Sequence, residues 1–190
     1  MQDRGQITGI MSPLLEKWRL SKVLQHINGN KILDYGCGCG KLASNLEDKE
    51  YVGVDINENI IETARNTYVK HNNTRFYTLK EFEKVESEFD CIVLSAIIEH
   101  LENPIEKIIQ FKKMLSKEGI IIITTPTSQA NQILEVGAHF RLFSKEAVDE
   151  HDELLDKNDF IQISKISSLI LEKYERFELG LNQLVVYRNV

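Results

Sequence analysis

The chain is poor in cysteine and proline, and it contains no long hydrophobic run. Its 190 residues include three cysteines and three prolines. Two of the cysteines, Cys37 and Cys39, are separated by a single residue, which does not resemble the disulfide framework of a small secreted domain. The apolar runs near 91–98 and 119–123 are too short to span a bilayer, and the N-terminus has no signal-peptide pattern. We therefore expect a cytoplasmic protein without a membrane-spanning segment.

The cysteines also lack the partners of a structural zinc site. Such a site takes four ligands, commonly from two separated pairs of cysteine or histidine. The chain has no second cysteine pair, because Cys91 stands alone. We interpret Cys37 and Cys39 as small side chains that fill a turn, and we expect no metal ion.

The chain has no linker rich in proline, glycine or serine, no internal repeat and no low-complexity tract. Its length predicts one domain with a buried core, and 42% hydrophobic and 27% charged residues are ordinary for a globular protein. A net charge of −6 disfavours a protein that binds nucleic acid over most of its surface. We expect residues 1–29 to form an N-terminal helical cap and residues 30–190 to form the core.

Strand and helix patterns alternate along the sequence. Short apolar runs predict strands at 31–35, 51–54, 74–78, 89–94 and 120–124. Amphipathic stretches predict helices at about 13–28, 41–47, 58–70, 104–116 and 145–157. Two final strands, 160–170 and 182–188, are close enough to pair as an antiparallel hairpin. This order predicts an α/β fold: a three-layer Rossmann-like sandwich whose seven-stranded sheet is mostly parallel, with an antiparallel C-terminal hairpin.

The most informative stretch joins the first predicted strand to the next predicted helix. Asp34 is followed by three alternating glycines, Gly36, Gly38 and Gly40. Glycines in such a turn permit positive φ angles and the close approach of a ligand to the backbone. A helix starting near Lys41 would direct free N–H groups and a partial positive charge toward the turn. This pattern favours a nucleotide-like cofactor at the carboxyl end of the first parallel strand.

An acidic residue, Asp55, ends the second predicted strand. A carboxylate at this place can accept hydrogen bonds from both ribose hydroxyls of a nucleotide-like cofactor, or it can cap the helix that follows. The glycine spacing narrows the ligand further. The dinucleotide fingerprint places its third glycine three residues after the second, whereas Gly40 lies two residues after Gly38. A cofactor without phosphates is therefore favoured over a dinucleotide.

Taken together, these segments resemble class I S-adenosylmethionine-dependent methyltransferases, and the ubiquinone-type enzymes in particular. The resemblance extends over about 30–188, and its motifs lie at 33–40, 52–55, 89–94, 98–104, 119–126 and 140–144. It implies S-adenosylmethionine as the cofactor. It also implies seven residues that contact this cofactor: Asp34 at the amino end, Gly36, Cys37 and Gly38 beneath the methionine part, Asp55 on the ribose, Ile56 on the adenine and the backbone of Ser95 beside the amino acid moiety. Relatives often carry an aspartate in the stretch that corresponds to 77–80, where this chain has none.

Two histidines are candidates for a catalytic general base. His100 follows the fourth strand at the edge where α/β sites lie, and His139 lies in the long stretch after the fifth strand. Either could instead be a packing residue. Some relatives bind a divalent ion through Glu-x-x-Glu-His at this point, but Ala96 replaces the first glutamate here. A reduced site from Glu99 and the two histidines is the weaker alternative, because a hard cation requires more carboxylate.

We expect an S-adenosylmethionine-dependent methyltransferase that acts on an oxygen, or a nitrogen, of a small-molecule acceptor. No nucleic-acid or membrane partner is expected, and the oligomeric state is left open. Arg141 is a candidate for binding an anionic acceptor. Three alternatives remain: a nicotinamide-dependent oxidoreductase, a methyltransferase of RNA or another macromolecule, and a non-catalytic protein that binds S-adenosylmethionine.

Overall fold

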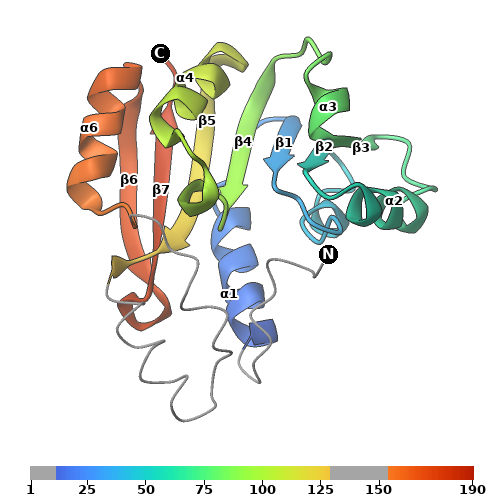
Figure 1. The fold of residues 1–190 in the computed structure, drawn as a ribbon, viewed down its shortest axis with the longest axis horizontal. Helices are drawn as coiled ribbons and strands as arrows, with labels where there is room; N and C mark the ends of the chain where they lie inside the picture. The colour runs from blue at the N-terminus through green and yellow to red at the C-terminus, as the bar shows by residue number, and fades with distance from the viewer. Residues whose placement is uncertain (1–11, 129–153) are drawn as a thin grey trace.

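The computed structural model describes residues 12–128 and 154–190, which build one twisted sheet with helices on both faces (Figure 1). Seven strands lie in the order β3-β2-β1-β4-β5-β7-β6. Their bounds are β1 (Lys31–Tyr35), β2 (Glu50–Asp55), β3 (Thr74–Thr78), β4 (Phe89–Ser95), β5 (Leu115–Pro126), β6 (Ile170–Phe177) and β7 (Asn182–Arg188). β1 to β5 pair in parallel, whereas β7 runs antiparallel to both β5 and β6. The expected mostly parallel sheet with an antiparallel C-terminal hairpin is confirmed.

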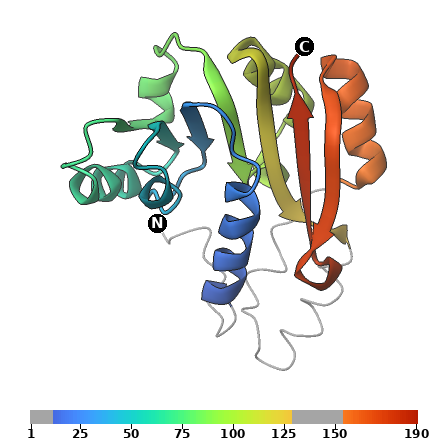
Figure 2. The ribbon, with the colours of Figure 1, turned by 180° about the vertical axis from the view of Figure 1, so that it is seen from behind.

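Five helices cover the described part of the sheet. They are α1 (Ser12–Leu24), α2 (Glu58–Thr67), α3 (Leu79–Phe82), α4 (Pro104–Lys113) and α6 (Lys157–Ser167). Figure 1 views the face that α4 covers, and Figure 2 views the opposite face, which α1 crosses.

Two hydrophobic cores, one on each face of the sheet, give the molecule its three layers. On the α4 face, Ile108 and Phe111 pack with Phe160 of α6 against alternate residues of the central strands. On the α1 face, Val23 and Ile61 belong to the second core. Both faces of the central strands are thus buried, which explains the apolar sequence of β4 and the four isoleucines at 120–123 in β5.

Polar side chains fix where the helices begin. The Asn57 side chain accepts hydrogen bonds from the backbone N–H groups of Asn59 and Ile60, so α2 starts immediately after β2 ends. A capping box formed by Asp156 and Asp159 starts α6. The Asn57 cap therefore places the first turn of α2 next to the carboxyl end of β2.

Two predicted elements are wrong. The helix expected at 41–47 is only a 3₁₀ turn, Ala43–Asn45, because the backbone hydrogen bonds of this segment join residues three apart. Its apolar side chains Leu42, Ala43 and Leu46 are buried in the core. The strand expected at 160–170 is α6 instead. Its buried Phe160 and Ile163 lie three residues apart, which is the period of a helix. The strand of this region starts at Ile170.

Smaller differences concern element ends. α1 ends at Leu24, α2 at Thr67 and α4 at Lys113, a few residues before the predicted limits. The helix expected at 145–157 falls mostly outside the described residues, and 154–156 are not helical. Within the described ranges, no helix is long and apolar enough to cross a membrane.

Candidate functional site

The predicted cofactor residues gather at the edge where the parallel strands end. In the β1–β2 register Asp34 is opposite Gly53 and Tyr35 is opposite Val54, while β4 pairs with the other side of β1. The glycine turn follows β1, and Asp55 and Ser95 are the last residues of the neighbouring strands β2 and β4, so all three lie at the carboxyl end of the parallel strands. This is the edge at which open α/β sheets bind their ligands.

Close packing on β2 and β4 sets the shape of the glycine turn. The backbone N–H groups of Gly36 and Cys37 both donate to the Val54 carbonyl, at 2.7 and 3.0 Å. Gly36 has a φ of +84°, and a Cβ atom there would stand 2.2 Å from Cγ1 of Ile97. Ile97 follows Ala96, itself at a φ of +54°. The Ile97 side chain thus packs directly on the turn, and together with the positive φ this contact favours glycine at position 36.

Gly38 differs from the other glycines of the turn. Its φ is +52°, and a Cβ atom at this position would have no atom of residues 12–128 or 154–190 within 4 Å. At Gly40, by contrast, a Cβ atom would approach the rings of Phe76 and Tyr68. Packing therefore accounts for Gly40, whereas open space lies in front of Gly38. A ligand can approach the backbone at this point, as the S-adenosylmethionine site expected from the sequence requires.

The Asp55 carboxylate ties the turn to the start of α2. Its Oδ2 accepts from the Gly38 N–H at 2.9 Å, and its Oδ1 accepts from the Asn57 N–H at 2.9 Å. Each carboxylate oxygen has a further lone pair, so ligand hydroxyls can also donate to it. The neighbouring Ile56 is 79% exposed. A carboxylate and an exposed apolar side chain therefore stand side by side next to the open backbone of Gly38.

Asp34 is buried behind the turn and pairs with a residue that the sequence analysis did not identify. Its Oδ2 accepts a hydrogen bond from the Tyr51 hydroxyl at 2.6 Å. Burial raises the pKa of Asp34 to about 6, the Tyr51 hydrogen bond lowers it, and the charge of Asp55 raises it. The pairing of Asp34 with Tyr51 follows from the register between β1 and β2. This register pairs Ile32 with Tyr51 and so places Tyr51 and Asp34 on the same face of the sheet.

The cysteines of the turn differ in their exposure. Cys37 is half-buried, and its thiol donates to the Gly38 carbonyl at 3.3 Å. Burial raises the pKa of the Cys37 thiol well above its usual range, which disfavours the thiolate that metal binding needs. Cys39 is exposed. Within 12–128 and 154–190, no cluster of three or more metal-binding side chains is present.

At the end of β4 and just after it, two polar side chains contact β5 and one is exposed. The hydroxyls of Ser95 and Thr124 are 3.1 Å apart and share a hydrogen bond. Glu99 is buried and accepts from the Thr125 hydroxyl at 2.9 Å, so its carboxylate is directed at β5. His100 closes the short 3₁₀ turn Ile98–His100 with an exposed side chain. His139 and Arg141 lie outside the described residues.

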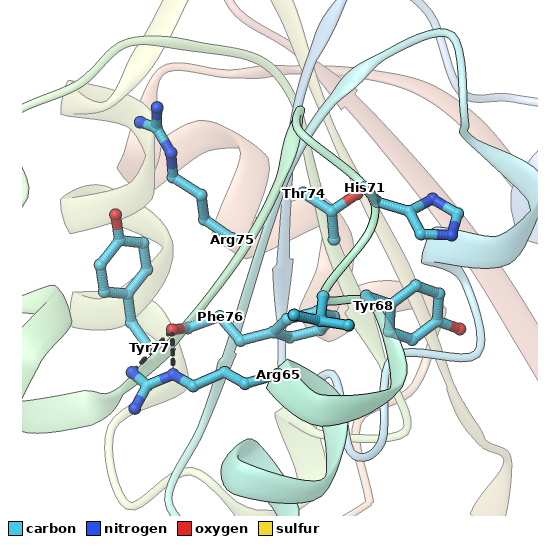
Figure 3. A pocket seen from close by; sticks show the side chains of 8 residues that line it. Arg65, Tyr68, His71, Thr74, Arg75, Phe76 and Tyr77 are labelled. Atoms are coloured by element: carbon cyan, nitrogen blue, oxygen red, sulfur yellow. Dashed lines mark hydrogen bonds between the residues drawn. The ribbon is translucent and has the colours of Figure 1, made fainter.

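A separate surface pocket of about 280 Å³ lies between α2 and β3 (Figure 3). In this view Arg65 reaches back to β3, where its Nε and Nη2 atoms both donate to the Phe76 carbonyl. Tyr68 and Phe76 line this pocket and also flank Gly40. The pocket wall therefore supports the far end of the glycine turn.

Comparison with known proteins identifies the family. The sequence model of a methyltransferase domain family matches residues 9–168. The chain belongs to this family. The class I S-adenosylmethionine-dependent methyltransferase family expected from the motifs is thereby confirmed, and with it an enzyme domain.

Curated relatives of the methyltransferase domain include ubiquinone biosynthesis O-methyltransferases. That of Rickettsia akari is 31% identical over 124 residues, which cover 60% of this chain and 49% of the relative. That of Pasteurella multocida is 29% identical over 148 residues, covering 67% and 61%. The methyltransferase domain thus spans about half the length of the first of these relatives.

The solved structures share the fold at low sequence identity. Magnesium protoporphyrin IX methyltransferase of Synechocystis PCC 6803, crystallised with bound S-adenosylhomocysteine, superposes with a TM-score of 0.68 at 14% identity. The match covers 94% of this chain and 83% of that one. It confirms the Rossmann-like architecture of the methyltransferase domain.

Proposed function

We propose that this methyltransferase transfers a methyl group from S-adenosylmethionine to an oxygen of a small-molecule acceptor. The placement of the cofactor rests on Gly38, whose backbone has no described side chain packed in front of it. Its N–H donates to the Asp55 carboxylate, which lies next to the exposed Ile56. The ubiquinone O-methyltransferase relatives support oxygen as the methylated atom and a small molecule as the acceptor.

The residues of the site fit the chemical parts of this cofactor. Asp55 binds the ribose hydroxyls with the remaining lone pairs of its carboxylate, and Ile56 covers the adenine. Gly36, Cys37 and Gly38 form the floor beneath the methionine part. The methionine end carries an amino group, for which Asp34 provides a negative charge, with the Ser95 backbone alongside. The two aspartates also complement the positive charge of a sulfonium.

Orientation is the main contribution of the protein to this reaction. The bound cofactor supplies an already activated methyl group, so the chain has to align it with the acceptor and exclude water. The glycine turn and Asp55 are fixed by backbone hydrogen bonds on both sides, which limits their motion. His100 is the proposed base for an acceptor hydroxyl within the described residues, and His139 is proposed as a second candidate.

Two measurements on the full chain test this function. Calorimetric titration with S-adenosylhomocysteine and with NAD compares the two cofactor classes, and we expect binding of the first alone. Incubation with isotopically labelled S-adenosylmethionine and a cell extract, separated afterwards into small metabolites, RNA and protein, shows by mass spectrometry which fraction is methylated. Binding of NAD without S-adenosylhomocysteine would overturn the cofactor site. Label found only in RNA or protein would overturn the small-molecule acceptor.

A further inference from the structure

Tyr51 and Asp34 form a buried pair directly behind the glycine turn. The Tyr51 hydroxyl donates to Oδ2 of Asp34 at 2.6 Å. Tyr51 has no exposed surface, and Asp34 retains 4%. Little water therefore reaches this carboxyl, and removal of the tyrosine hydroxyl would leave a largely buried acid with one hydrogen bond fewer.

The sequence of β2 makes this contact possible. Gly53 is directly opposite Asp34 in the strand register, and Tyr51 precedes it by two residues on the same face. A Cβ atom on Gly53 would stand 2.7 Å from the Phe76 ring and 2.9 Å from Sγ of Cys37. With glycine at this position, the Tyr51 side chain extends along the strand pair and reaches the carboxyl without a competing side chain.

The surroundings of Asp34 oppose its ionisation except at this hydrogen bond. Burial raises the pKa of Asp34 to about 6, and the nearby charge of Asp55 also raises it. Among the described residues that act on this pKa, Tyr51 favours the charged form. Three more titratable side chains interact electrostatically with the pair: Cys37, Cys91 and Tyr68. None of them carries a positive charge that could replace the hydroxyl.

We propose that Tyr51 is a positioning residue for cofactor binding, whose hydroxyl keeps the Asp34 carboxyl ionised and oriented toward the cofactor's amino group. This inference rests on the proposed placement of Asp34 at the amino end of the cofactor. Tyr51 itself does not touch the cofactor; it acts through Asp34. A proton on Asp34 removes the charge that the ammonium group requires, so Tyr51 sets the pH below which the cofactor is lost.

The test is the pH dependence of S-adenosylhomocysteine affinity in the Tyr51→Phe variant. A hydrogen bond to a charged group contributes enough to displace the midpoint of the affinity profile upward by about one to two pH units. We expect the variant to bind about ten-fold more weakly than the parent at pH 6.5 and almost equally at pH 9. The dissociation constant of the variant is divided by that of the parent at each pH, so that any effect of ligand titration, which is the same for both proteins, cancels.

Tyr68→Phe is the matched control. Its hydroxyl donates to the Gly40 carbonyl at 2.7 Å, in the same turn but on a neutral acceptor. Any loss of affinity in this variant should be the same at every pH. A Tyr51→Phe ratio that is equally flat across pH would overturn the positioning role.

Asp34→Asn separates this inference from the proposed function. If Asp34→Asn binds S-adenosylhomocysteine as tightly as the parent at neutral pH, the placement of Asp34 in the site is wrong. If it binds weakly while the Tyr51→Phe ratio stays flat, the placement holds and the role of Tyr51 is wrong. Should Tyr51→Phe fail to fold, carbon-13 NMR titration of the Asp34 carboxyl in the parent decides. The inference is supported if the Tyr51 ring carbon next to the hydroxyl shifts with the same midpoint as the Asp34 carboxyl and this midpoint matches that of the affinity profile. A Tyr51 carbon that does not respond to the Asp34 titration contradicts it.

Discussion

The Asp55 carboxylate and the Gly38 N–H, 2.9 Å apart, join the end of β2 to the turn that follows β1. One hydrogen bond thus connects the residue proposed to bind the ribose with the backbone proposed to lie beneath the methionine part. The same carboxylate holds the Asn57 N–H at the start of α2. Loss of this side chain therefore disturbs three segments of the site at once.

Asp55→Ala should weaken S-adenosylhomocysteine binding by about 10- to 100-fold, since it removes a charged hydrogen bond to the turn and the proposed ones to the ribose. Isothermal titration calorimetry gives the dissociation constant. Asp48→Ala, which removes an exposed aspartate on the approach to β2, is the control and should leave it unchanged. Equal affinity of Asp55→Ala and the parent would show that the ribose lies elsewhere.

Alanine at Gly38 and at Gly36 should have different effects, although both residues have positive φ. Gly38→Ala costs about 1–2 kcal/mol of stability from the left-handed backbone, and it places a methyl group where the cofactor is proposed to lie. Gly36→Ala pays the same cost and overpacks against Ile97, which adds about 1–3 kcal/mol.

Urea unfolding and cofactor titration together distinguish the two glycines. We expect Gly38→Ala to lose more affinity than stability and Gly36→Ala to lose the most stability. If Gly38→Ala binds S-adenosylhomocysteine normally, the open space in front of this residue is not the cofactor path.

Removal of the charge on Glu178 should stabilise the fold at neutral and alkaline pH. Glu178 is buried, and burial raises its pKa above the ordinary value. A raised pKa in the folded state means that ionisation favours the unfolded chain as pH increases. Glu178→Gln should therefore unfold at higher urea than the parent at pH 8, and the gain should vanish below the ordinary glutamate pKa. The glutamine oxygen can still accept from the Asn182 amide.

Glu172→Gln is the control for this measurement, because its carboxylate is on the surface and pairs with Arg188. It should show little change, since exposed ion pairs contribute less than about 1 kcal/mol. A Glu178→Gln variant that is less stable than the parent at pH 8 would mean that the charge is favourable in the fold.

His100→Ala should slow turnover without weakening cofactor binding, if His100 is the base. General-base removal typically lowers kcat by about 100- to 10,000-fold. Stopped assays of methylated product at saturating cofactor measure kcat, and calorimetry measures the affinity. His71→Ala, in the α2–β3 connection, is the histidine control. A change of less than two-fold in kcat would assign the proton transfer to another group, and His139→Ala is then the next variant.

The sheet could be predicted from the sequence because its central strands are buried on both faces. Ile32 and Leu33 in β1, like Ile92 and Val93 in β4, are fully buried. Short apolar runs of this kind are typical of strands that are covered on both faces. The Asn57 cap of α2 and the proline at the start of α4 add local signals that can be seen in the sequence itself.

Two features were not predicted, one because a local signal was missed and one because it depends on tertiary contacts. Residues 160–170 alternate well enough to read as a strand, but the capping box at Asp156 and the packing of Phe160 on the sheet favour a helix. The Tyr51–Asp34 pair needs the register of two strands, which neither strand shows alone. The placement of each cofactor residue remains a prediction, because it concerns a ligand rather than the fold.

Arg65 has a consequence for the outer rim of the sheet. β3 is an edge strand, and edge strands expose carbonyls and N–H groups that can pair with a strand from another chain. Both donors of Arg65 occupy the Phe76 carbonyl in the middle of β3, and the same guanidinium is paired with Glu81. A strand arriving from solvent would have to displace a charged side chain that is held at two points. We therefore expect Arg65 to hinder the pairing of β3 with a strand from another chain.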